Sequence, residues 1–133
     1  MSEKSKREVH PQAREYFEKG IAALRKDNLD YATKLFEQAL KREPGFFECR
    51  EALRLNQFKR VEKKGSFFKI FGKTTSSSLL PKGQLALRKN PIEAIEVAEQ
   101  ILNEDPYSVM GNKLLGEAAT LAEFYKTALF AWE

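Results

Sequence analysis

The stretch that decides the fold is residues 11–44, PQAREYFEKGIAALRKDNLDYATKLFEQALKREP. Apolar and small residues recur in it at steps of three and four, which is the spacing of one face of an α-helix. Pro11 is suited to the first position of a helix, and residues 26–28 interrupt the apolar pattern. Pro44 ends the pattern, because proline disfavours helix in the residue before it. The stretch therefore predicts two antiparallel helices joined by a tight turn.

Small and bulky residues alternate along these two helices. Helices approach closely only where the side chains between them are small, so we expect Gly20 and Ala32 to face each other across the pair. Tyr16 and Phe36 then fill the wider gaps. The residues expected to pack the helices together are Tyr16, Gly20, Ala23, Ala32, Phe36, Ala39 and Pro44.

This spacing resembles the tetratricopeptide repeat, a helix–turn–helix unit of about 34 residues. It recurs on later residues, namely Ala94, Ala98 and Pro106 at an offset of 62 and Gly116 and Ala128 in the repeat after that. The resemblance implies an all-α fold, a short right-handed α-solenoid of antiparallel helix pairs with about seven helices. It also implies a non-catalytic scaffold that binds other proteins.

The repeat boundaries give the expected organisation of the chain. Residues 1–9 show no apolar periodicity and are expected to form a disordered tail before a single domain over residues 10–133. The first repeat covers about 11–44, an interrupted repeat about 46–106, and a truncated repeat about 108–133. Within the interrupted repeat we expect helices at 46–63 and 79–89, separated by a mobile loop at about 65–78 that is rich in serine and threonine.

The last predicted helix begins near Phe124 and is still apolar at Glu133. Solenoids need polar end repeats for solubility. We therefore expect either a fragment of a larger protein or an open end that a second copy covers. In a homodimer of that kind, Phe130 and Trp132 would lie near the shared surface.

The concave face of such repeats is formed by the first helix of each pair, and partners bind there as extended or helical peptides. Phe17 and Ile21 stand where some members of the family carry the basic residues that capture acidic tails, so we expect an apolar groove for a peptide or helix. The same apolar residues are equally compatible with plain core beneath the inserted segment. The expected groove residues are Arg14, Phe17, Ile21, Leu24, Arg25, Met110, Lys113 and Glu117, with Glu48, Glu51, Leu55 and Phe58 as further candidates.

A basic and aromatic segment at residues 59–73 has several interpretations. Residues 41–75 carry ten Lys and Arg against four Asp and Glu, whereas residues 76–133 carry five against eight. Lysines beside aromatic rings suit nucleic acid or an anionic membrane, and they also suit a protein partner. Alternatively, the phenylalanines cover the extra helix and the lysines face water. The candidate contact residues are Lys63, Lys64, Phe67, Phe68, Lys69 and Phe71.

No set of residues suited to catalysis is present. The chain has one cysteine, Cys49, so it cannot form an internal disulfide. Together with the one histidine, His10, it also provides too few ligands for a tetrahedral zinc site. Neither lies in a nucleophile motif, and no glycine-rich phosphate loop is present. We therefore expect neither an enzyme nor a bound cofactor or metal. With no signal peptide or membrane-spanning run in the sequence, we expect a cytoplasmic protein whose partner is a protein or peptide.

Overall fold

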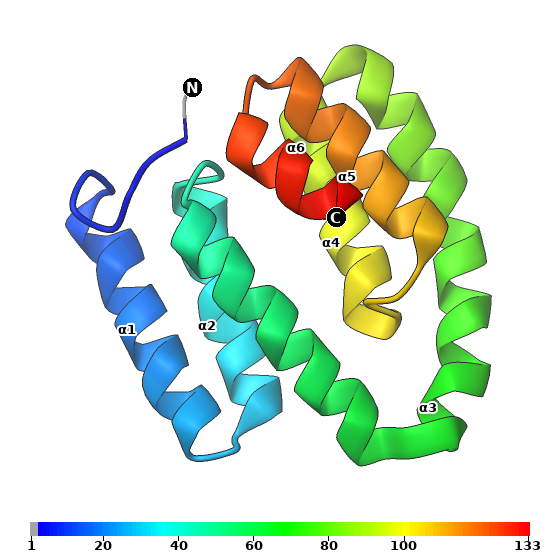
Figure 1. Cartoon of the computed structure of the whole chain (residues 1–133), viewed down its shortest axis with the longest axis horizontal. Helices are drawn as coiled ribbons and strands as arrows, with labels where there is room; N and C mark the ends of the chain where they lie inside the picture. The colour runs from blue at the N-terminus through cyan, green and yellow to red at the C-terminus, as the bar shows by residue number, and fades with distance from the viewer. Residues whose placement is uncertain (1–2) are drawn as a thin grey trace. The chain divides into compact units, whose positions relative to one another are not determined.

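The computed structural model describes residues 3–133, apart from the side chains of residues 64–78. The described backbone is helical with no named strand, so the all-α fold predicted from the sequence is confirmed. Antiparallel helices lie side by side in pairs, as Figure 1 shows for α1 with α2 and for α5 with α6. The six helices are α1 (Pro11–Arg25), α2 (Leu29–Arg42), α3 (Phe47–Lys89), α4 (Pro91–Glu104), α5 (Val109–Leu121) and α6 (Tyr125–Trp132).

The chain divides into two compact units, Met1–Arg60 and Val61–Glu133, and α3 continues from the first into the second. Each unit has an apolar core of its own. The first core centres on Phe17, Phe36 and Phe46, whose ring centroids lie 6.2 Å apart for Phe17 and Phe36 and 4.9 Å apart for Phe17 and Phe46. Ala94, Ala98 and Ala119 are among the fully buried residues of the second core. The two units are described separately below.

The first helix pair is closed by a ring packed onto a glycine. A Cβ atom on Gly20 would lie 2.5 Å from Cε1 of Phe36, which is fully buried. At the turn, Asp27 has a positive φ of 64°, and the Asn28 N–H donates to the Ala23 carbonyl at 2.9 Å. This is the left-handed helix end that lets a chain reverse within a few residues.

The last helix pair repeats these contacts with an offset of 96 residues. A Cβ atom on Gly116 would lie 2.5 Å from the indole of Trp132, and Glu123 has a φ of 63°. The Phe124 N–H donates to the Ala119 carbonyl at 2.8 Å. The spacing noticed in the sequence therefore corresponds to one helix-hairpin geometry that the chain forms twice.

The turns after Pro44 and Pro106 also match, with an offset of 62 residues. Arg50 Nη2 donates to the Pro44 carbonyl at 2.9 Å, and Asn112 Nδ2 donates to the Pro106 carbonyl at 3.2 Å. An arginine in one turn and an asparagine in the other thus donate to the equivalent proline carbonyl. Both prolines are buried.

Helix α3 differs from the two helices and mobile loop expected at residues 46–89. Its backbone is helical from Phe47 to Lys89 and includes Pro81. Serine and threonine have only modestly unfavourable helix propensities, so the composition of 65–78 disfavours a helix without excluding one. The side chains of the segment lie outside the described residues.

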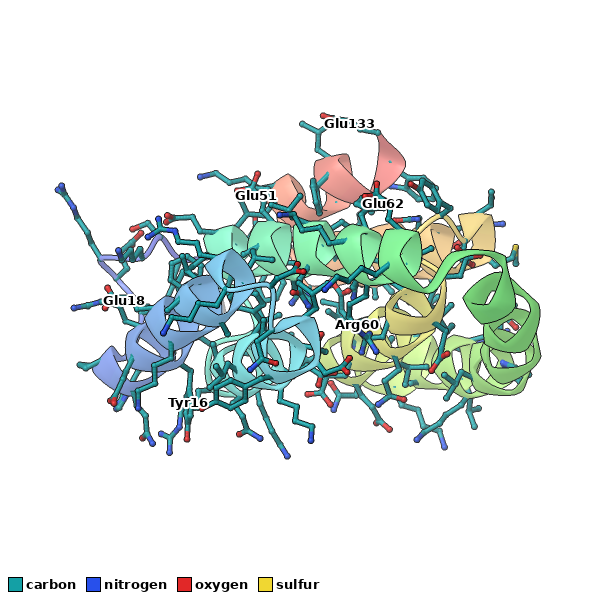
Figure 2. All side chains as sticks on the ribbon, turned by 90° about the horizontal axis from the view of Figure 1, so that it is seen from below. Tyr16, Glu18, Glu51, Arg60, Glu62 and Glu133 are labelled. Carbon is teal, nitrogen blue, oxygen red and sulfur yellow. The ribbon has the colours of Figure 1, made fainter. Side chains whose placement is uncertain are left out.

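Within the first unit, α3 is fastened to the beginning of α2 by polar contacts. Asn56 is fully buried, and its Nδ2 donates to the Leu29 carbonyl at 3.0 Å and to Thr33 Oγ1 at 2.7 Å. Arg60, labelled in Figure 2, forms an ion pair with Asp30 at 3.0 Å. Glu51, also labelled there, lies on the exposed side of α3. These contacts fix which side of α3 faces the helix pair.

Candidate peptide-binding site

The structure gives the expected groove residues of α1 different surroundings. Phe17 and Leu24 are each 8% exposed and belong to the first core, where the Phe17 ring packs against Phe36 and Phe46. Ile21 is partly buried against the same core, whereas Arg25 is exposed. The expected apolar lining on this helix is therefore largely core, whereas the two expected arginines, Arg14 and Arg25, are not buried.

The other expected groove residues lie on α5 in the second unit. Met110 and Lys113 are exposed, and Glu117 is half-buried. On α3, Glu48, Glu51 and Leu55 are exposed. Lys63 is also exposed. The remaining candidates of the basic segment, Lys64, Phe67, Phe68, Lys69 and Phe71, have side chains outside the described residues.

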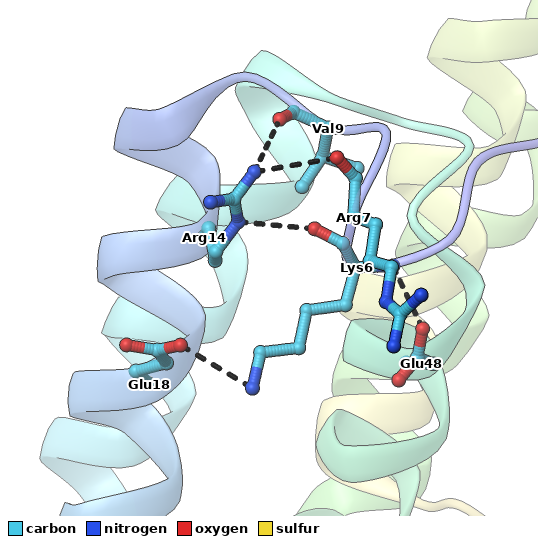
Figure 3. A network of polar contacts seen from close by, with 6 residues as sticks. All are labelled: Lys6, Arg7, Val9, Arg14, Glu18 and Glu48. Atoms are coloured by element: carbon cyan, nitrogen blue, oxygen red, sulfur yellow. Dashed lines mark hydrogen bonds and ion pairs between the residues drawn. The ribbon is translucent and has the colours of Figure 1, made fainter.

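The most developed polar arrangement surrounds residues 3–9, where the sequence predicts a disordered tail. These residues lie between α1 and the beginning of α3, as Figure 3 shows. Val9 is 3% exposed and belongs to the first core, which explains why the segment docks despite its many charges. Residues 1–2 lie outside the described residues.

Arg14 holds this segment by its backbone. Its Nε donates to the Lys6 carbonyl at 3.1 Å, and its Nη2 lies 3.4 Å from the carbonyls of both Arg7 and Val9 (Figure 3). A guanidinium presents several donors in a rigid fork, which suits it to bind neighbouring carbonyls together. Arg14 was expected to contact a partner peptide, and here it contacts a segment of its own chain.

The backbone amides of the segment are bonded as well. The Lys4 N–H donates to the Gly45 carbonyl at 2.8 Å, and Lys4 and Phe46 form an isolated parallel β-bridge. The Lys6 N–H donates to Glu48 Oε1 at 2.8 Å (Figure 3). Lys4 forms this single bridge and a turn begins at Lys6, so residues 4–6, which we call the docked segment, are held on both sides without forming a strand.

The side chains of Lys4 and Lys6 form ion pairs with carboxylates. Lys4 Nζ lies 3.5 Å from Glu43 Oε2, and Lys6 Nζ lies 3.3 Å from Glu18 Oε1. Lys6 Nζ is also 5.9 Å from the centroid of the Phe17 ring, within reach of a cation–π interaction. We call the set Arg14, Phe17, Glu18, Glu43 and Glu48 the α1–α3 site.

An open pocket lies beside the docked segment, residues 4–6. Its volume is about 660 Å³, and its lining includes Ser5, Arg7, Arg14 and Glu48. Nearby on α1, Glu15 raises the pKa of Lys19 through a hydrogen bond, at an Nζ–Oε1 distance of 3.0 Å. Lys19 is therefore paired with Glu15 and leaves Glu18 to Lys6.

Sequence reasoning identified Arg14 and Glu48 but missed Glu18 and Glu43. A surface carboxylate on a helix has no pattern that separates it from a solvated one. The sequence around Lys4 and Lys6 carries no pattern that would have identified these two carboxylates as their partners. The burial of Val9, which places residues 3–8 beside α1 and α3, was also not predicted from the sequence.

The described residues contain no cluster of three or more His, Cys, Asp or Glu that would suit a metal ion. Cys49 is fully buried, with its thiol 3.5 Å from the Phe36 carbonyl oxygen. His10 Nδ1 accepts a hydrogen bond from the Gln12 N–H at the beginning of α1. In the described part of the chain, none of the helices has both the length and the apolar character needed to cross a membrane.

Comparison of the chain with models of known protein families, with curated proteins and with solved structures finds no significant match.

Proposed function

We propose that this chain is a non-catalytic protein-interaction module of tetratricopeptide type, which binds a peptide in the α1–α3 site. The observation that carries the proposal is the docked segment, residues 4–6, because the site already binds it through its backbone. Lys4 N–H, Lys6 N–H and the Lys6 carbonyl all have partners there. Main-chain hydrogen bonds of this kind supply affinity for extended peptides in general.

The internal repeat supports the same proposal. The hairpins α1–α2 and α5–α6 share their glycine–ring contact and their left-handed turn. Repeated helix hairpins present extended surfaces that suit the binding of other chains. The resemblance to the tetratricopeptide family, which rests on the same residues, points to the same class of function. The expected apolar groove on α1 is replaced in the proposal by a polar site, since Phe17 and Leu24 are core residues.

A selection of random peptides displayed on phage against the full chain tests the proposal. Retained peptides are resynthesised, and their affinities are measured for the wild type, for Arg14→Ala and for a matched control, Arg42→Ala, on an exposed position of α2. Because Arg14 makes several charge-assisted contacts to carbonyls, its loss should weaken binding by about tenfold or more. The control should bind as the wild type does. A selection that yields no binding peptide, or peptides that bind Arg14→Ala equally well, would contradict the proposal.

A further inference from the structure

We infer that the α1–α3 site selects a basic segment of a partner protein, with two lysines separated by one residue, and that residues 4–6 of this chain occupy the site until such a segment displaces them. This inference rests on the proposed function, since it names the partner chemistry and the regulation of the same site. It combines three observations: the charges of the site, the backbone contacts, and the exposure of the docked segment.

The charges of the site fit lysines at alternate positions. Lys4 forms the single bridge and Lys6 begins the turn that follows it, and the side chain of each reaches a carboxylate. Lys4 and Lys6 meet Glu43 and Glu18 at 3.5 and 3.3 Å, while Ser5 between them is exposed. Each lysine thus has a carboxylate of its own. An acidic segment in the same place would bring like charges together, which disfavours it.

The hydrogen bonds to the backbone of residues 4–6 do not involve the side chains of these residues. The Gly45 carbonyl accepts the first amide, Glu48 accepts the second, and Arg14 donates to the carbonyl of the second lysine. Any segment whose backbone follows the same course as residues 4–6 can offer the same amides and carbonyl. Affinity therefore comes from these three groups together with the two ion pairs, and the ion pairs to Glu18 and Glu43 provide the selectivity for lysine.

The contacts of the docked segment are exposed enough for it to be replaced by another chain. The side chains of Lys6 and Glu18 remain 44% and 55% exposed, and ion pairs this exposed contribute little and weaken with salt. The buried anchor of the segment is Val9, which lies beyond a local turn in which the Glu8 N–H donates to the Ser5 carbonyl at 3.0 Å. Residues 4–6 can therefore leave the site while Val9 stays in the core.

The test uses full-length chains and a fluorescent peptide with the sequence of residues 3–8, Glu-Lys-Ser-Lys-Arg-Glu. A second peptide carries glutamine in place of both lysines. Anisotropy titrations compare the wild type with Lys4→Ala/Lys6→Ala. This variant weakens the binding of residues 4–6 to the α1–α3 site, because it removes both ion pairs. The matched control is Lys34→Ala/Lys41→Ala, which removes the same charge from two exposed positions of α2.

We expect the lysine peptide to bind Lys4→Ala/Lys6→Ala about tenfold tighter than it binds the wild type or the control. Apparent affinity falls in proportion to the fraction of molecules whose site is free, so a site that is about nine-tenths occupied gives that ratio. We also expect the glutamine peptide to bind the same variant about tenfold more weakly. Adding Glu18→Gln and Glu43→Gln should remove this difference between the peptides, while circular dichroism confirms an intact fold.

Three results would overturn the inference in different ways. If both peptides bind Lys4→Ala/Lys6→Ala equally, the selectivity for lysine is wrong and the proposed peptide-binding function stands. If neither peptide binds that variant, the α1–α3 site is not a peptide site and the proposed function falls with the inference. If the wild type sediments as a dimer that Lys4→Ala/Lys6→Ala dissociates, the occupant is a second copy of this chain and not a different protein.

Discussion

At the scale of single residues, Gly20 and Gly116 hold equivalent places but lie under rings of unequal freedom. Phe36 above Gly20 is fully buried, whereas Trp132 above Gly116 is 55% exposed. A buried ring cannot move aside without disturbing its neighbours, because protein interiors are close-packed. The same substitution should therefore have different consequences in the two hairpins.

Gly20→Ala should lower the free energy of unfolding by about 1–3 kcal/mol, the usual cost of overpacking a core. Gly116→Ala should be close to neutral, because Trp132 can move outward and alanine is favoured over glycine in a helix by about 1 kcal/mol. Urea unfolding followed by circular dichroism measures both. Trp132 is the only tryptophan, so its fluorescence reports the ring movement directly. Equal losses in the two variants would contradict the explanation.

At the scale of elements, the helix starts were the most predictable features. Pro11 and Pro91 each occupy the first position of a helix, and the Asn90 side chain accepts from the Glu93 N–H at 3.4 Å. These signals are local, so the sequence alone reveals them. The continuity of α3 through residues 65–78 was missed, because weak helix propensities in a serine and threonine run do not determine whether a helix stops.

The helix caps give an element-scale prediction. Ser108 Oγ accepts from the Gly111 N–H at 3.0 Å at the beginning of α5, whereas the Asn28 side chain makes no cap hydrogen bond at the beginning of α2. Ser108→Ala should therefore lower the free energy of unfolding by about 1 kcal/mol.

Asn28→Ala is the matched control and should change the free energy of unfolding by only a few tenths of a kcal/mol, since no cap bond is lost. Thermal and urea unfolding of the two variants give the comparison. A larger loss for Asn28→Ala than for Ser108→Ala would show that the cap geometry does not govern these helix ends.

At the scale of the whole molecule, the repeat was predictable and the α1–α3 site only partly so. The repeat is encoded in short spacings such as Gly20 to Phe36, which helix geometry translates directly into contacts. The pairing of Lys4 with Glu43 joins residues far apart in the sequence and depends on the finished hairpin. Surface charges of this kind acquire partners only after the core has placed them, so the sequence singled out Arg14 and Glu48 but not Glu18 and Glu43.

The measurement that tests the central claim most directly is an NMR titration of the full-length Lys4→Ala/Lys6→Ala chain with the lysine peptide. If the α1–α3 site binds a basic segment, amide shifts should concentrate on Glu18, Gly45, Phe46 and Glu48, the residues that contact residues 4–6 in the free chain. Because surface ion pairs are screened, the shifts should diminish as salt is raised. Shifts confined to residues 59–73, or to α5 and α6, would contradict the claim and assign binding to another surface.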